Sequence, residues 1–171
     1  DWSSTFLMEY HKDSKLYIEG GIFLKNISTK YDFWANNFHY TSVEQKMGEL
    51  SFYAKARWRP HPLLIIEPGL RVANYGTETL QDKDAEYFLR LEPRLGIKYI
   101  LTEYSRLKVA WGVYNQAMQK YKRDGSSFSA VWTVADPTST PAHAIHWTGG
   151  IEFDLNEGTV MEIEGYYKNM N

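Results

Sequence analysis

Ionisable side chains recur at alternate positions in several stretches of this sequence. In residues 89–99, for example, Arg90, Glu92, Arg94 and Lys98 alternate with apolar residues. Successive side chains of a β-strand point to opposite faces, so a strand here has one ionic and one apolar face. The residues that the pattern places on the ionic face are Lys55, Arg57, Glu67, Arg71, Arg90, Glu92, Arg94, Glu152, Asp154, Glu162 and Glu164.

This ionic face has two interpretations. It can line a lumen, where it bonds to a plug or to water, or it can be the exposed face of a soluble sheet. We favour the lumen, because the opposite face is equally apolar and no second layer is encoded to cover it. Unpaired ions are costly in an enclosed space, which explains why both signs of charge occur.

The sequence offers no convincing catalytic or metal site. His143 and His146 are three residues apart and would point to opposite faces of a strand, with no cysteine to complete a metal set. No motif joins the remaining candidates for Ser/His chemistry, which are His39, His61, Ser126 and Ser127. We therefore expect no enzyme activity, no metal and no cofactor, with a lipid-modifying barrel enzyme as the least favoured alternative. The net charge of −2 also lacks the basic excess that is typical of nucleic-acid-binding proteins.

The elements that carry these residues are predicted to be eight strands. Their connections alternate between short turns and long loops, and the long loops cover residues 27–45, 75–85 and 117–142. No apolar run approaches the roughly 18 residues of a membrane helix. The predicted strands are 5–11, 15–26, 47–59, 63–74, 86–101, 105–116, 143–155 and 159–168.

This pattern predicts an all-β fold, an antiparallel up-and-down transmembrane β-barrel with about eight strands in residues 1–171. A strand of about 12 residues, tilted by about 40°, rises about 30 Å and crosses the apolar band of an outer membrane. The 13 tyrosines, 8 phenylalanines and 6 tryptophans of the chain suit aromatic girdles at the two membrane interfaces, although a β-protein can simply be rich in aromatics. We expect the lipid-facing residues to be Leu89, Leu91, Leu95, Ile97, Leu107, Val109, Trp111 and Val113.

Two features qualify this pattern. Pro68 and Pro93 lie within strands, where a missing N–H predicts a bulge or a broken ladder. Aromatic residues in the long loops could stack on a ligand at the barrel mouth or simply pack against neighbouring loops. These candidate substrate residues are Tyr31, Trp34, Phe38, Tyr40 and Trp132.

The ordered motifs of the second half resemble a known family. Residues 92–99 (EPRLGIKY) precede a strand that ends in Tyr114, Asn115 and Gln116, then a long loop, a strand that begins near His143, and a hairpin that ends in residues 166–168 (YYK). This order is similar to the C-terminal half of the barrel in TonB-dependent outer-membrane receptors. The resemblance is best over residues 86–170 and weaker over residues 49–71.

The resemblance implies part of a barrel of about 22 strands that imports an iron chelate, cobalamin or a glycan. It also implies a bacterial outer-membrane location, contact with the bilayer, and a plug domain and TonB system as partners. No plug segment is recognisable in the sequence, so we expect a barrel fragment. The alternative is a self-contained eight-stranded barrel with a structural or adhesive role, in which the first and last strands would pair.

Overall fold

The computed structural model describes residues 1–35, 38–79, 85–122, 130–136 and 139–170. All regular structure in these ranges is β-strand, and they contain no helix that is long and apolar enough to cross a membrane. The strands are β1 (Trp2–Asp13), β2 (Leu16–Ala35), β3 (Phe38–His61), β4 (Leu64–Thr79), β5 (Glu86–Thr102), β6 (Ser105–Gln116), β7 (Met118–Lys122), β8 (Ala130–Val134), β9 (Ala142–Asn156) and β10 (Thr159–Met170).

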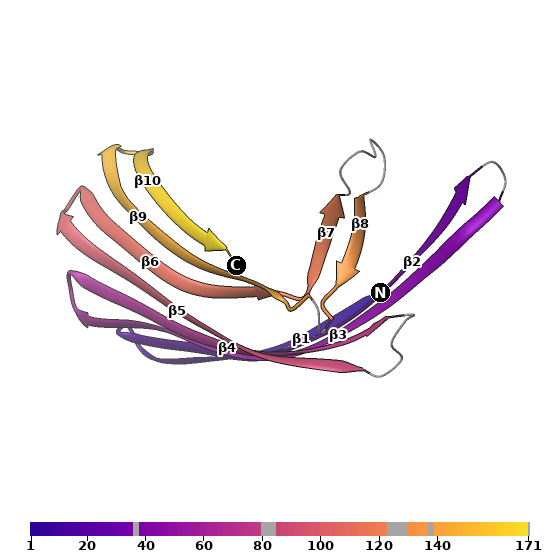
Figure 1. Cartoon of the computed structure of the whole chain (residues 1–171). Coiled ribbons are helices and arrows are strands. Elements are labelled where there is room, and N and C mark those ends of the chain that lie inside the picture. Colours follow the sequence, from indigo (N-terminus) through magenta and orange to yellow (C-terminus); the bar gives the residue numbers. More distant parts are fainter. Residues whose placement is uncertain (36–37, 80–84, 123–129, 137–138, 171) are drawn as a thin grey trace.

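Eight of these strands form one antiparallel sheet in the order β1-β2-β3-β4-β5-β6-β9-β10, which confirms the predicted up-and-down arrangement. The sheet curves like a trough, and β7 and β8 form a separate hairpin that rises from its concave side (Figure 1). Strands β1 and β10 are the two edges and do not pair with each other in the described ranges. The sheet is therefore open, and the closed eight-stranded barrel is not observed.

The predicted long connections were partly wrong. Residues 27–35 and 38–45 are strand rather than loop, because β2 runs to Ala35 and β3 begins at Phe38, with paired register along both. Strand β4 likewise continues to Thr79, and residues 117–142 contain the β7–β8 hairpin. Alternating β-branched and aromatic residues in these stretches favour strand, and cross-strand pairing satisfies the backbone groups that a loop would expose.

The convex face of the sheet carries the apolar side chains. Leu89 and Leu91 are 65% and 60% exposed, and Leu95 and Ile97 are 38% exposed. Large apolar side chains left uncovered in this number suit contact with lipid. One predicted lipid-facing residue does not fit, because Val113 near the end of β6 is buried.

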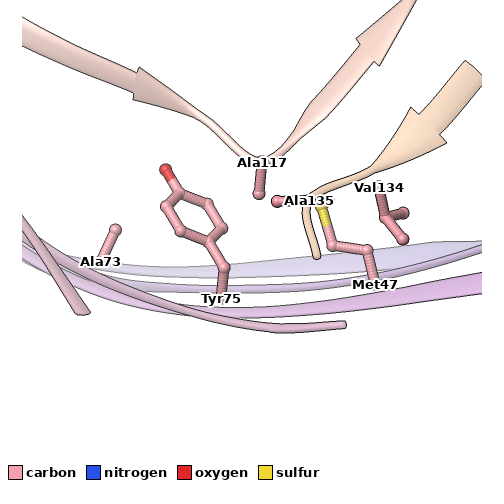
Figure 2. Close-up of a cluster of buried hydrophobic side chains, with 6 residues drawn as sticks. All are labelled: Met47, Ala73, Tyr75, Ala117, Val134 and Ala135. Carbon is pink, nitrogen blue, oxygen red and sulfur yellow. The ribbon is translucent and has the colours of Figure 1, made fainter. Parts of the chain in front are cut away.

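The buried apolar cluster lies on the concave side, between the sheet and the base of the β7–β8 hairpin. Met47, Ala73 and Tyr75 rise from β3 and β4 to meet Ala117, Val134 and Ala135 (Figure 2). Thr77 Oγ1 donates a hydrogen bond to the carbonyl of Ala135 at 2.7 Å. The hairpin is therefore seated on the sheet by both apolar packing and a polar contact.

Candidate functional site on the concave face

The ladders bring every predicted ionic residue to one face of the sheet. Arg71 is paired with Glu92 across β4 and β5, and Glu152 is paired with Glu162 across β9 and β10. Tyr75, which shares the face of Arg71, points towards the β7–β8 hairpin in Figure 2. The ionic face is therefore the concave one, and its charges form three groups.

The first group lies on β2, β3 and β4 near the short turns. Lys55 Nζ is 2.9 Å from Glu19, and Arg57 Nε is 2.6 Å from Glu67. The Arg57 and Glu67 side chains are 66% and 45% exposed, so solvent screens this pair.

The second group crosses β6, β9 and β10. Arg106 is 2.6 Å from both Glu152 and Asp154, and Lys108 is 2.7 Å from Glu162. The alternation named the three acids and places Lys108 on the polar face of its strand, but Lys108 was not among the predicted ionic residues and Arg106 was missed. Their alternation with Leu107 and Val109 was the available signal, because it places both on the ionic face, where the register pairs Arg106 with Glu152.

The third group is the most deeply buried and lies at the centre of the sheet. The Glu92 side chain is 1% exposed. Its Oε2 accepts hydrogen bonds from Arg71 Nη1 at 3.3 Å and from Arg94 Nη2 at 3.1 Å. Arg71 Nη2 also pairs with Glu49 and donates to Ser51 Oγ at 3.1 Å. Buried carboxylates with such partners keep their charge at a tolerable cost, so this group fixes β3, β4 and β5 together.

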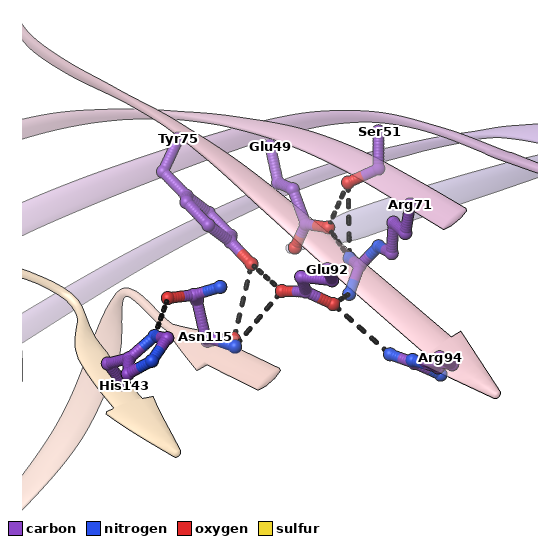
Figure 3. A network of polar contacts seen from close by, with 8 residues as sticks. All are labelled: Glu49, Ser51, Arg71, Tyr75, Glu92, Arg94, Asn115 and His143. Atoms are coloured by element: carbon purple, nitrogen blue, oxygen red, sulfur yellow. Dashed lines mark hydrogen bonds and ion pairs between the residues drawn. The ribbon is translucent and has the colours of Figure 1, made fainter. Parts of the chain in front are cut away.

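Glu92 has a second set of contacts with the backbone of β6. Its Oε1 accepts a hydrogen bond from the Asn115 N–H at 3.0 Å, and the Tyr75 hydroxyl donates to the Asn115 carbonyl at 3.3 Å (Figure 3). Asn115 Oδ1 lies 3.1 Å from His143 Nδ1 on β9. The end of β6 is thus tied to side chains of the concave face.

The remaining predicted residues are more peripheral. Arg90 lies over the Phe88 ring, with its guanidinium carbon 5.9 Å from the centroid, and Glu164 is exposed on β10. His146 packs on Tyr114 with ring centroids 4.6 Å apart, away from the His143–Asn115 contact. Among the described residues, no group of histidine, cysteine and carboxylate side chains is arranged to hold a metal ion.

The candidate substrate residues divide into two groups. The backbone N–H of Trp132 donates a hydrogen bond to the Tyr31 hydroxyl at 3.1 Å, so these two residues lie together although they are far apart in sequence. Trp34 belongs to β2, and Phe38 and Tyr40 belong to β3, but their side chains lie outside what the structure describes.

The concave side of the described strands is hollowed in places. A broad groove of about 1210 Å³ follows the ionic residues from β1 to β5, including Glu19, Lys55 and Arg71. A smaller cavity of about 470 Å³ lies under the hairpin and is lined by Lys25, Tyr75, Trp132 and neighbours. This volume is within the range of small-molecule sites, and the cavity joins the charged side chains of Lys25, Arg71 and Glu49 to aromatic and apolar walls.

Comparison with known proteins identifies the fold. No protein-family model matches the sequence, and neither does any curated protein sequence. Among solved structures, the ferric-catecholate import receptor Fiu from E. coli K12 matches 98% of the chain with a TM-score of 0.69 and 10% identity. The ferric yersiniabactin uptake receptor FyuA from Yersinia pestis matches 98% with a TM-score of 0.66 and 12% identity.

The chain spans less than a third of these receptors, covering 30% of Fiu and 28% of FyuA. The alcaligin outer-membrane receptor FauA from Bordetella pertussis gives a TM-score of 0.58 at 12% identity, with 93% of this chain and 31% of that chain covered. All three are TonB-dependent outer-membrane receptors. The fold is therefore that of a stretch of wall from this class of β-barrel, as the sequence motifs predicted.

Proposed function

We propose that this chain forms consecutive strands in the wall of a TonB-dependent receptor that imports an iron chelate across a bacterial outer membrane. The observation that carries the proposal is an open eight-stranded sheet, apolar on the convex face and ionic on the concave face, that superposes on siderophore receptors over 93–98% of its length. Further strands of the same barrel would pair with the free edges of β1 and β10, since an unpaired edge is unfavourable in lipid.

In this proposal the two faces have different partners. The convex leucines and isoleucines contact the bilayer. The ionic groups around Glu19, Glu92 and Glu152 face a plug domain, whose polar surface they would bind, and the TonB system acts on that plug. A wall with both signs of charge can bind a mixed polar surface without leaving unpaired ions.

The iron chelate is favoured as substrate over cobalamin or a glycan because the compared receptors are named for ferric chelates and siderophores. The cavity beneath the hairpin is a candidate contact for it. Trp132 and Lys25 line it and offer stacking and a positive charge, and the Tyr31 hydroxyl is bonded to the backbone of Trp132.

The test is iron uptake by cells that produce the full-length protein containing this chain. With a ferric siderophore labelled with radioactive iron, uptake should depend on the protein, on TonB and on the proton-motive force. Cells that take up labelled cobalamin or a glycan, but no ferric chelate, would contradict the proposed substrate.

A matched pair of variants tests whether the ligand contacts the cavity. Trp132→Ala removes an aromatic side chain at the cavity, whereas Trp2→Ala removes one that is 57% exposed on the edge strand β1. We expect Trp132→Ala to raise the half-saturating chelate concentration several-fold, since an interfacial tryptophan is often worth more than about 1 kcal/mol. Equal behaviour of both variants would count against ligand contact at the cavity.

A further inference from the structure

The pairing between β5 and β6 stops midway along β5. The ladder runs from Thr102–Ser105 to Arg94–Gly112 and no further. On its other side β5 continues to pair with β4 as far as Glu86. In the described part of the chain, no strand pairs with the β6-facing edge of β5 over residues 86–93.

Pro93 explains where the pairing stops. The Ile100 N–H donates to the carbonyl of Leu63, the residue just before β4, at 2.8 Å, so even-numbered residues of β5 direct their backbone groups to β4. Odd-numbered residues, including Leu91 and Pro93, direct theirs to β6. Proline has no N–H, and the ladder ends beside the first position where that donor is missing.

Two side chains take over the missing backbone contacts of β6. If the register continued past Arg94–Gly112, Asn115 would lie opposite Leu91 and exchange both backbone hydrogen bonds with it. Instead Glu92 Oε1 accepts from the Asn115 N–H, and the Tyr75 hydroxyl donates to the Asn115 carbonyl. The carboxylate and the hydroxyl thus replace the C=O and N–H of Leu91.

The residues that follow Asn115 also have complementary positions along β5. Continuing the same register places Met118 opposite Phe88 and Lys120 opposite Glu86. An apolar pair and an ion pair of opposite sign are both favourable across strands. Residues 114–120 therefore fit two places, the concave face that they occupy and the free edge of β5.

We propose that the free edge of β5, residues 86–91, is a docking edge whose occupant is the chain's own segment 114–120. The end of β6 and the β7–β8 hairpin exchange between a seated state on the concave face and a docked state in the wall. β9 moves with them, because it stays paired with β6 up to Gln116–Ala142. In the seated state the hairpin stands inside the trough (Figure 1), and docking removes it from there.

Cysteine pairs distinguish the two states, since the chain has no cysteine of its own. Leu91→Cys with Asn115→Cys reports docking. Leu91 is exposed on the convex face, whereas Asn115 lies on the concave side, so the two meet only when segment 114–120 enters the wall. Paired strand positions lie about 5.5 Å apart between Cα atoms, which suits a disulfide.

Thr77→Cys with Ala135→Cys reports the seated state, because these residues share a hydrogen bond there. Leu91→Cys with Val160→Cys is the control for random collision, since these residues lie on strands separated by β6 and β9. Each pair is placed in the full-length protein in its outer membrane, oxidised with copper phenanthroline, and scored by mass spectrometry of the linked peptides.

We expect both reporter pairs to form disulfides within one molecule, well above the control. Tyr75→Phe removes the hydroxyl that holds Asn115, so it should accelerate the docking disulfide about two- to tenfold, as loss of one hydrogen bond predicts. Tyr166→Phe on β10, whose side chain is 83% exposed, should leave the rate unchanged.

Three outcomes overturn the proposal. A docking pair that reacts no faster than the control means that the hairpin stays seated, and a seated pair that never reacts means that it stays docked. A docking disulfide that forms only between two molecules means that the edge accepts a second copy. None of these readouts depends on iron uptake, so the proposed transport function succeeds or fails separately.

Discussion

Two prolines interrupt this sheet, and the strands respond differently to each. Pro68 directs its backbone towards β3, where the ladder omits the Ala56–Pro68 and Arg57–Glu67 pairs and then resumes at Trp58–Ile66. Pro93 directs its backbone towards β6, where the ladder does not resume. Each site lacks one donor, so the missing hydrogen bond alone cannot explain the difference.

The neighbouring side chains explain it. At Pro68 the ion pair between Arg57 and Glu67 bridges the two strands across the gap and favours their remaining together. At Pro93 the adjacent Glu92 is buried on the concave face and binds the backbone of β6, which draws that strand out of the wall. A proline therefore weakens a ladder, and the acid beside it determines which way the partner strand goes.

Removing the arginine partner of each acid tests this comparison and should give its largest effect. Arg71→Met leaves Glu49 unpaired and Glu92 with Arg94 alone, and both carboxylates are buried. Breaking a buried pair typically costs about 3–5 kcal/mol of unfolding free energy. Arg57→Met breaks an exposed pair and should cost less than about 1 kcal/mol. Urea unfolding of the full-length protein in lipid vesicles measures both.

Equal losses from the two arginine variants would mean that Glu92 is hydrated, like Glu67, rather than enclosed. The seated hairpin would then not exclude water from the centre of the sheet. A loss from Arg71→Met that disappears when Glu49 and Glu92 are both replaced by Gln would support the stated cause, because no buried charge would then be left unpaired.

A second test concerns the apolar face between the two prolines. Leu95 is paired with Pro68 and lies two residues from Pro93, on the convex face. Leu95→Arg should cost about 2–4 kcal/mol if that face meets the middle of a bilayer. Ala110→Arg is the matched control, because Ala110 is exposed on the concave face one pair away in the same ladder. A cost for Leu95→Arg no greater than for the control would contradict the lipid assignment.

The sequence was sufficient to predict the eight strands, their order and their two faces, because alternation is a local property of each strand. It also placed the broken ladders at Pro68 and Pro93, since a missing N–H is a property of the residue itself. The extension of β2 to Ala35 and the start of β3 at Phe38 were missed, because the Ser, Thr and aromatic side chains there are compatible with either loop or strand. Only the register of both strands resolves that ambiguity.

The role of Glu92 was less predictable. Alternation placed it on the ionic face with Arg71 and Arg94, and these three do meet. Its contact with the Asn115 N–H depends on β6 leaving the wall, which is a tertiary event with no local signal. For the same reason Val113 was predicted to face lipid and is buried.

The smallest expected effect comes from restoring the missing donors. Pro93→Val supplies an N–H directed at β6, so it should favour the docked state by about one hydrogen bond, about 0.5–1.5 kcal/mol. In the Leu91→Cys, Asn115→Cys background this corresponds to a rise of about two- to tenfold in the docking disulfide. Pro68→Val supplies the same donor to β3 and should leave that disulfide unchanged, because β3 and β4 already pair on both sides of the gap. If Pro68→Val accelerated the disulfide as much as Pro93→Val, the effect would be a general softening of the sheet. The break beside Pro93 would then not control whether the end of β6 is seated or docked.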